Sequence, residues 1–266
     1  MGGALVEALL SAGTEVIALA RGVDGARRLA DAGADVVRGD IGEVVRWDSR
    51  AADAEVIFHL ALPRMVPPVR RRHLRKAERE AAAGAEIVAG IAGDRPLVVG
   101  SCAIGDSDGA LEIARPALAV EASLRGSDAR IVRLPWAYGP SGFICDMSRG
   151  LQMRRFRMVG PATNHIALIG ARDAARALIA AAAAPPGTYA VAEPDPPTQM
   201  ELVHHLCAAR KAPRPDHLPP RMAGVSMGSV VVDALTADQR VDVAPPAGFV
   251  PAQRWERDIA GALRGE

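Results

Sequence analysis

The segment MGGALVEALLSAGTEVIALARG (residues 1–22) decides the fold class, because it joins an amphipathic helix directly to a buried strand. Apolar residues recur every three or four positions over residues 4–12, which predicts the helix. Gly13 marks a turn, and the run TEVIALA (residues 14–20) predicts a strand. Helices that alternate with such strands are typical of a doubly wound α/β sheet.

More units of the same kind follow along the chain. Runs rich in apolar residues at 34–40, 54–62, 95–101 and 129–140 predict further strands, and helical stretches separate them. Runs of this kind, without an in/out alternation, indicate parallel strands covered by helices on both faces. We therefore predict a doubly wound parallel sheet, the Rossmann dinucleotide-binding architecture, over residues 1–140.

The pattern loosens from residue 141 onward, and we predict a second, smaller part over residues 141–266. Residues 155–170 predict two short strands around a turn, residues 171–184 a helix and residues 187–193 a strand. Residues 194–228 are dense in proline and glycine and contain one predicted helix at 198–210. We expect a substrate lobe or lid over the carboxyl edge of the sheet, with helices that return to the sheet.

The composition excludes several classes of partner. The formal net charge of 266 residues is +1, which indicates neither a nucleic-acid partner nor an anionic membrane surface. The chain has no signal-peptide pattern and no long uncharged apolar run. Its three cysteines match no metal-binding spacing, and we expect free thiols in a cytoplasmic protein without a metal site. The sequence does not indicate an oligomeric state.

Four motifs in consistent order carry a family resemblance. GGALVEALLSAGTEVIALARG (2–22), VVRGDI (36–41), VIFHLALP (56–63) and RLPWAYGP (133–140) resemble the extended short-chain dehydrogenases/reductases, in the NAD-dependent epimerase/dehydratase branch. In that register Gly2 is the last glycine of the family's GxxGxxG turn. The resemblance implies a strand and two glycines ahead of it, with a native start upstream, and two unpaired strand edges where that strand is truncated. A degenerate nucleotide site is the alternative.

The same resemblance assigns a cofactor site. NAD-preferring relatives carry an acidic residue at the end of the second strand, where this chain has Ala20 followed by Arg21. An arginine there can pair with a 2′-phosphate, so we expect NADP. The resemblance places the cofactor against Gly2, Arg21, Asp40, Ile41, Leu60, Ala61, Leu62, Ser101, Pro135, Ala137 and Tyr138.

The family's Tyr-x-x-x-Lys catalytic pair is absent from the sequence. The two tyrosines are Tyr138 and Tyr189, and neither has a lysine four residues later. In register, Ile113 and Ala117 stand where the tyrosine and lysine belong. The resemblance also implies a serine that holds the substrate oxygen. That position falls on Ser101 or Cys102, and Ser101 is our candidate catalytic residue.

Loss of the pair favours hydride transfer over proton abstraction, because an epimerase or dehydratase needs a protein base. We expect an NADPH-dependent ketoreductase that acts on a polyketide-type or other secondary-metabolite carbonyl, as in antibiotic biosynthesis. The chain is similar to atypical family members that act as angucycline polyketide ketoreductases of the simocyclinone type. The alternatives are a non-redox isomerase, cyclase or epimerase in the same pocket, and a non-catalytic relative. His59 is either a functional group beside the cofactor or a core histidine.

Overall fold

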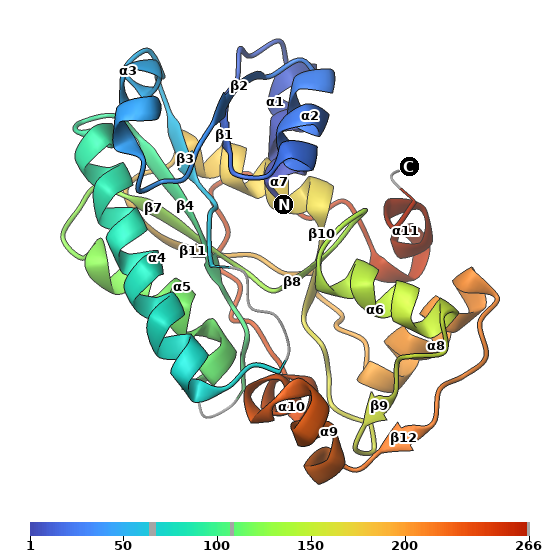
Figure 1. The fold of residues 1–266 in the computed structure, drawn as a ribbon. Helices are drawn as coiled ribbons and strands as arrows, with labels where there is room; N and C mark the ends of the chain where they lie inside the picture. Colours follow the sequence, from blue (N-terminus) through green and yellow to red (C-terminus); the bar gives the residue numbers. More distant parts are fainter. Residues whose placement is uncertain (64–67, 107–108, 265–266) are drawn as a thin grey trace.

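The computed structural model describes residues 1–63, 68–106 and 109–264 (Figure 1). The strands are β1 (Ile17–Ala20), β2 (Asp35–Arg38), β3 (Ile57–His59), β4 (Leu97–Cys102), β5 (Gly105–Asp106), β6 (Gly109–Ala110), β7 (Arg130–Leu134), β8 (Trp136–Tyr138), β9 (Met158–Val159), β10 (Leu168–Gly170), β11 (Gly187–Ala190) and β12 (His217–Leu218). The helices are α1 (Gly2–Ser11), α2 (Val23–Asp31), α3 (Asp48–Ala51), α4 (Arg71–Ala92), α5 (Arg115–Ser123), α6 (Phe143–Gln152), α7 (Ala171–Ala182), α8 (Gln199–Arg210), α9 (Pro220–Met227), α10 (Ser229–Thr236) and α11 (Trp255–Ala262). Two short 3₁₀ helices, η1 (Val44–Arg46) and η2 (Glu112–Ala114), precede α3 and α5.

Parallel strands form the centre of the molecule. The main sheet has the order β11-β7-β4-β3, and every pairing in it is parallel. β1 pairs in parallel with β2 in a separate two-stranded sheet. This order and direction confirm the predicted doubly wound parallel architecture.

Helix α1 connects the two sheets. Its Leu5 is buried in one cluster with Val98 and Val132 of the main sheet, whereas its Val6 is buried in another with Ala18 of β1. Among the described residues, β1 pairs only with β2, and β3 only with β4. β1 and β3 are therefore edge strands of these two sheets.

Helices cover both faces of the main sheet. α4 and α5 pack against each other and against one face, where Ala85, Val99 and Val120 are buried together. α7 covers the opposite face and packs against α1, as Figure 1 shows. Since α7 and β11 both come from residues 141–266, the second part of the chain completes the first. The boundary at residue 140 stays a prediction.

The remaining elements form a lobe at the carboxyl edge of the sheet. The two short strands predicted within 155–170 exist as β9 and β10, but they do not pair with each other, because β9 pairs with β12 and β10 continues alongside β8. The prediction of one helix within 194–228 is wrong, since α9 follows α8 there. Pro220 is the first residue of α9, where a proline costs the helix no hydrogen bond.

Three side-chain amides hold the end of α10 in the lobe. The Asn164 amide donates to the carbonyls of Leu235 and Ala237, at 2.9 Å each. Gln199 also donates to the Leu235 carbonyl, and Gln239 donates to that of Ala234. Gln199 and Gln239 are fully buried. The carbonyls that a helix end leaves free therefore find partners inside the protein.

Candidate functional site

The carboxyl ends of parallel strands meet at one edge of a sheet, where ligands of open α/β sheets bind. Most predicted cofactor residues lie at these ends. Arg21 follows β1, Asp40 and Ile41 lie just beyond β2, and residues 60–62 follow β3. Ser101 is near the end of β4, and residues 135–138 follow β7.

Arg21 and Asp40 are in contact at this edge. Their charged groups are 3.4 Å apart, and both side chains are more than half exposed. The Asp40 carboxylate also accepts the backbone N–H of Ile41 at 2.7 Å. An exposed ion pair of this length is weak, so the Arg21 guanidinium remains available to an incoming phosphate.

The N-terminus of α1 suits a diphosphate. Its first turn has no acidic residue and no side-chain cap, so its leading N–H groups are free to face an anion. A Cβ atom at Gly2 would meet nothing within 4 Å. Together with Arg21, Asp40 and Ile41, these features fit a dinucleotide, with the diphosphate at α1 and the adenosine beyond β1 and β2.

Residues 60–62 line the middle of the edge. A Cβ atom at Gly100 would lie 2.7 Å from the end of the Leu60 side chain, so a larger residue there would displace Leu60. Leu62 is half-buried against the α4 and α5 face, and Ala61 is exposed. On α4, Gly84 similarly leaves room for Ile41, whose side chain lies 3.6 Å from the position of a Cβ atom there.

Ser101 is engaged in a buried network. Its hydroxyl donates to Glu121 of α5 at 2.5 Å, and Arg133 of β7 donates to both oxygens of the same carboxylate, at 2.9 and 2.6 Å. The neighbouring Cys102 is free, and burial raises the pKa of its thiol to about 11. Glu121 is absent from our sequence prediction. The signal that could have found it is its spacing, because it follows Ala117 by one turn on the same helix face.

The two positions that the resemblance assigns to the family's acid–base pair hold apolar side chains. Ala117 is buried beneath α5, and Ile113 of η2 packs against a cluster that includes Val230 and Val231 of α10. Neither Tyr138 nor Tyr189 supplies an acid–base group at these two positions. Tyr189 donates its hydroxyl to the Pro185 carbonyl at 2.7 Å.

Tyr138 is turned into the lobe core and has no exposed surface. Its hydroxyl lies beside the buried Glu193 carboxylate, which also accepts the backbone N–H of Trp255 at 2.7 Å. Burial raises the pKa of both groups. Pro135 and Ala137 lie on the same connection, Pro135 buried and Ala137 half-buried against the face that α7 covers.

His59 is a buried histidine at the end of β3. It is 4% exposed, its Nε2 has no partner in the described part of the chain, and burial lowers its pKa to about 4. An imidazole that stays neutral to this pH carries no charge toward a cofactor. The burial of His59 therefore favours a core histidine.

We predict a pH effect on stability from this histidine. Because the unfolded chain binds a proton near pH 6.5 and the folded chain only near pH 4, folding stability falls as the pH drops between these values. From pH 7 to 4.5, the free energy of unfolding should fall by roughly 2–3 kcal/mol more in the native protein than in His59→Leu. Urea unfolding at both pH values measures the difference, and equal losses in the two proteins would contradict it.

The sequence matches no protein-family model and no curated protein. Solved structures match over nearly the whole chain. The Thermotoga maritima UDP-glucose 4-epimerase, solved with UDP-glucose, has a TM-score of 0.78 at 15% identity and covers 99% of this chain and 94% of its own. The human epimerase family protein SDR39U1, solved with NADPH, has a TM-score of 0.75 at 16% identity, and the match covers 100% of this chain and 96% of its own. The Thermus thermophilus UDP-glucose 4-epimerase, solved with NAD, has a TM-score of 0.75 at 17% identity, and the match covers 99% of this chain and 96% of its own.

The fold is that of the extended short-chain dehydrogenase/reductase epimerases. The resemblance to the epimerase/dehydratase branch is thus confirmed at the level of the fold. Two of these neighbours were solved with a dinucleotide, SDR39U1 with NADPH and the Thermus thermophilus enzyme with NAD. Among the described residues, no group of histidine, cysteine or acidic side chains could hold a metal ion, and no helix has the length and apolarity to cross a membrane.

Proposed function

We propose that this protein is an NADPH-dependent ketoreductase that acts on a polyketide-type or related secondary-metabolite carbonyl. One observation carries the proposal. The chain has the fold of dinucleotide-dependent epimerases, yet the resemblance puts Ile113 and Ala117 at the positions of the acid–base pair, where Ile113 packs against apolar residues and Ala117 is buried. Proton abstraction from a sugar carbon lacks its base there, whereas delivery of a hydride needs mainly a well-placed carbonyl.

The residues present support NADPH more than NADH. Arg21 stands where NAD-preferring folds carry an acid, and its exposed guanidinium can form a bidentate pair with a 2′-phosphate. Asp40 and Ile41 would flank the adenine, and the first turn of α1 would hold the diphosphate. When bound, NADPH supplies the hydride.

The protein contributes position and exclusion of water. Leu60, Ala61 and Leu62, together with Pro135 and Ala137, would border the nicotinamide with small or apolar side chains. The Ser101 hydroxyl donates its hydrogen bond to Glu121, so its oxygen is left as an acceptor for a substrate hydroxyl group. The proton for the new alcohol then comes from solvent or from an acidic hydroxyl on the substrate itself, such as a phenol beside the ketone.

Titration of NADPH fluorescence tests the cofactor, and loss of NADPH absorbance across a panel of aromatic and aliphatic ketones tests the reaction. We expect saturable binding and oxidation with an aromatic ketone. Absence of binding would contradict the proposal. Binding without oxidation of any ketone would favour the non-redox isomerase or the non-catalytic relative instead.

Arg21→Ala should relax the choice of cofactor. Loss of a charge-assisted pair with the 2′-phosphate should lower the ratio of NADPH to NADH affinity by about tenfold or more. Dissociation constants for both cofactors measure this ratio. Arg27→Ala is the matched control, because Arg27 lies on the neighbouring α2 in an exposed ion pair with Asp31. An unchanged ratio in Arg21→Ala would refute the role of Arg21.

We further propose that the protein works in the cytoplasm on a small molecule. Cys102, Cys145 and Cys207 are all free thiols, which suits a reducing compartment. Labelling of these thiols in cell extracts prepared without reductant tests the idea, and their recovery in oxidised form would contradict it.

A further inference from the structure

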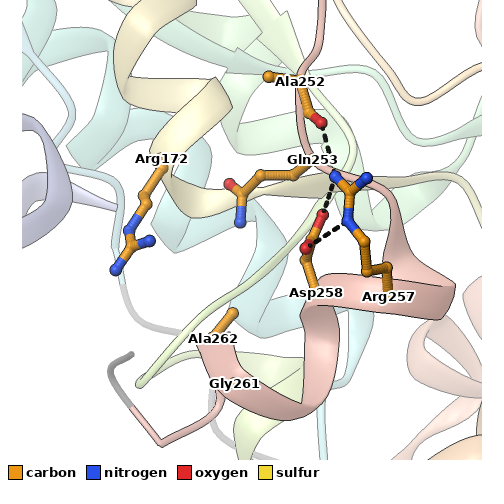
Figure 2. A pocket seen from close by; sticks show the side chains of 7 residues that line it. All are labelled: Arg172, Ala252, Gln253, Arg257, Asp258, Gly261 and Ala262. Carbon is orange, nitrogen blue, oxygen red and sulfur yellow. Dashed lines mark hydrogen bonds and ion pairs between the residues drawn. The ribbon is translucent and has the colours of Figure 1, made fainter.

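A cavity of about 320 Å³ opens between α7 and α11. Figure 2 shows its lining, with Arg172 from the first turn of α7, Gln253 from the segment before α11, and Arg257 and Asp258 from α11. None of the predicted cofactor residues lines it. The cavity is at the lower end of the volumes that small-molecule sites occupy.

The acidic groups at this cavity are neutralised by their neighbours. Asp258 pairs with Arg257 at 2.9 Å and accepts the backbone N–H of Arg254 at 2.7 Å. The Arg257 side chain is the main cause that lowers the pKa of Asp258. Behind the cavity, the buried Asp173 pairs with Arg176 at 2.7 Å. Neither carboxylate is left to attract a cation.

Donor groups at the cavity remain free. Within the described residues, the Arg172 guanidinium has neither a hydrogen bond nor an ion pair. Gln253 accepts the Asp173 N–H at 3.3 Å through its oxygen, which leaves its NH₂ group free. Arg257 is engaged with its neighbours instead, because its Nε and one terminal nitrogen donate to Asp258 and to the Ala252 carbonyl.

We propose that this cavity binds the phosphate group of a small phosphorylated metabolite. Free donors on Arg172 and Gln253 line this cavity and can bind phosphate oxygens, and guanidinium–phosphate bonds are among the stronger hydrogen bonds in proteins. The excess positive charge attracts a dianion. A bound phosphate would bridge α7 and α11, and ligand bound only by the folded state stabilises it.

Thermal unfolding in chloride, inorganic phosphate and glycerol 3-phosphate at equal ionic strength tests the proposal. We expect both phosphates to raise the unfolding midpoint above that in chloride, with saturation as their concentration rises. Acetate at the same ionic strength distinguishes a phosphate site from a general anion effect. No phosphate-specific rise, or an equal rise in acetate, would overturn the proposal.

Two variants locate the site. Arg172→Ala should weaken the apparent phosphate affinity by about tenfold or more, and it should fold normally because its guanidinium has no structural partner in the described residues. Arg149→Ala is the control. It removes another exposed arginine, which pairs with Asp146 on α6, and it should leave the phosphate affinity unchanged. Retained affinity in Arg172→Ala, or its loss in Arg21→Ala instead, would place phosphate elsewhere and overturn the assignment.

Discussion

An apolar strand of six residues, joined to the front of α1 through a glycine-containing turn, should raise the unfolding midpoint by about 10 °C or more. The gain comes from the unpaired edges of β1 and β3. A strand between them forms backbone hydrogen bonds on both sides, and its side chains are buried beneath α1 on one face. After the entropy of ordering six residues is subtracted, we expect the free energy of unfolding to rise by on the order of 5 kcal/mol.

The control for this extension has the same length and turn, with proline at two alternate strand positions. Proline cannot donate to a ladder and is confined to sheet edges. The proline-containing extension should therefore raise the unfolding midpoint little or not at all. Thermal unfolding followed by circular dichroism compares the two extended proteins. Equal midpoints for both extensions would show that the edges do not accept a strand. The first extension should also improve NADPH binding, since the turn brings backbone N–H groups to the diphosphate.

Asp173→Ala should lower the free energy of unfolding by about 3–5 kcal/mol. The Asp173 side chain is 1% exposed. Its Oδ2 accepts the backbone N–H groups of Ala252 and Gln253 at 2.7 Å each, and its Oδ1 accepts Arg176. Removal leaves the two part-buried N–H groups without their acceptor and takes from Arg176 its ion-pair partner, although Arg176 keeps its contacts with the Val250 carbonyl and the Phe249 ring.

Urea unfolding measures this loss, with two companion variants. Asp173→Asn keeps one acceptor oxygen of the same shape and should lose clearly less stability than the alanine variant. Asp146→Ala removes an exposed carboxylate whose partner Arg149 lies 3.5 Å away, and should change stability little. A loss in Asp173→Ala no larger than in Asp146→Ala would show that Asp173 does not hold the segment before α11 onto α7.

The sequence predicts the main sheet well because its signal is local. Apolar runs such as residues 54–62 and 129–140 identify strands regardless of their partners, and the helix at residues 4–12 reveals itself by its period. The absence of a Tyr-x-x-x-Lys pair is also a property of the sequence, since it needs only the positions of two tyrosines. The lobe is less predictable. Its strands have two or three residues each, and their partners lie far along the chain, as with β9 and β12.

What the sequence by itself determined is the parallel α/β architecture, the identity of the residues at the strand ends and the loss of the acid–base pair, because period, composition and motif spacing are encoded residue by residue. Only the tertiary structure decided that Ser101 is bound to Glu121, that Tyr138 points into the lobe core, and that Arg172, Gln253 and Arg257 meet at one cavity. These facts depend on side chains that are 20 to more than 80 positions apart. Their contacts are set by tertiary packing, which short sequence patterns do not predict.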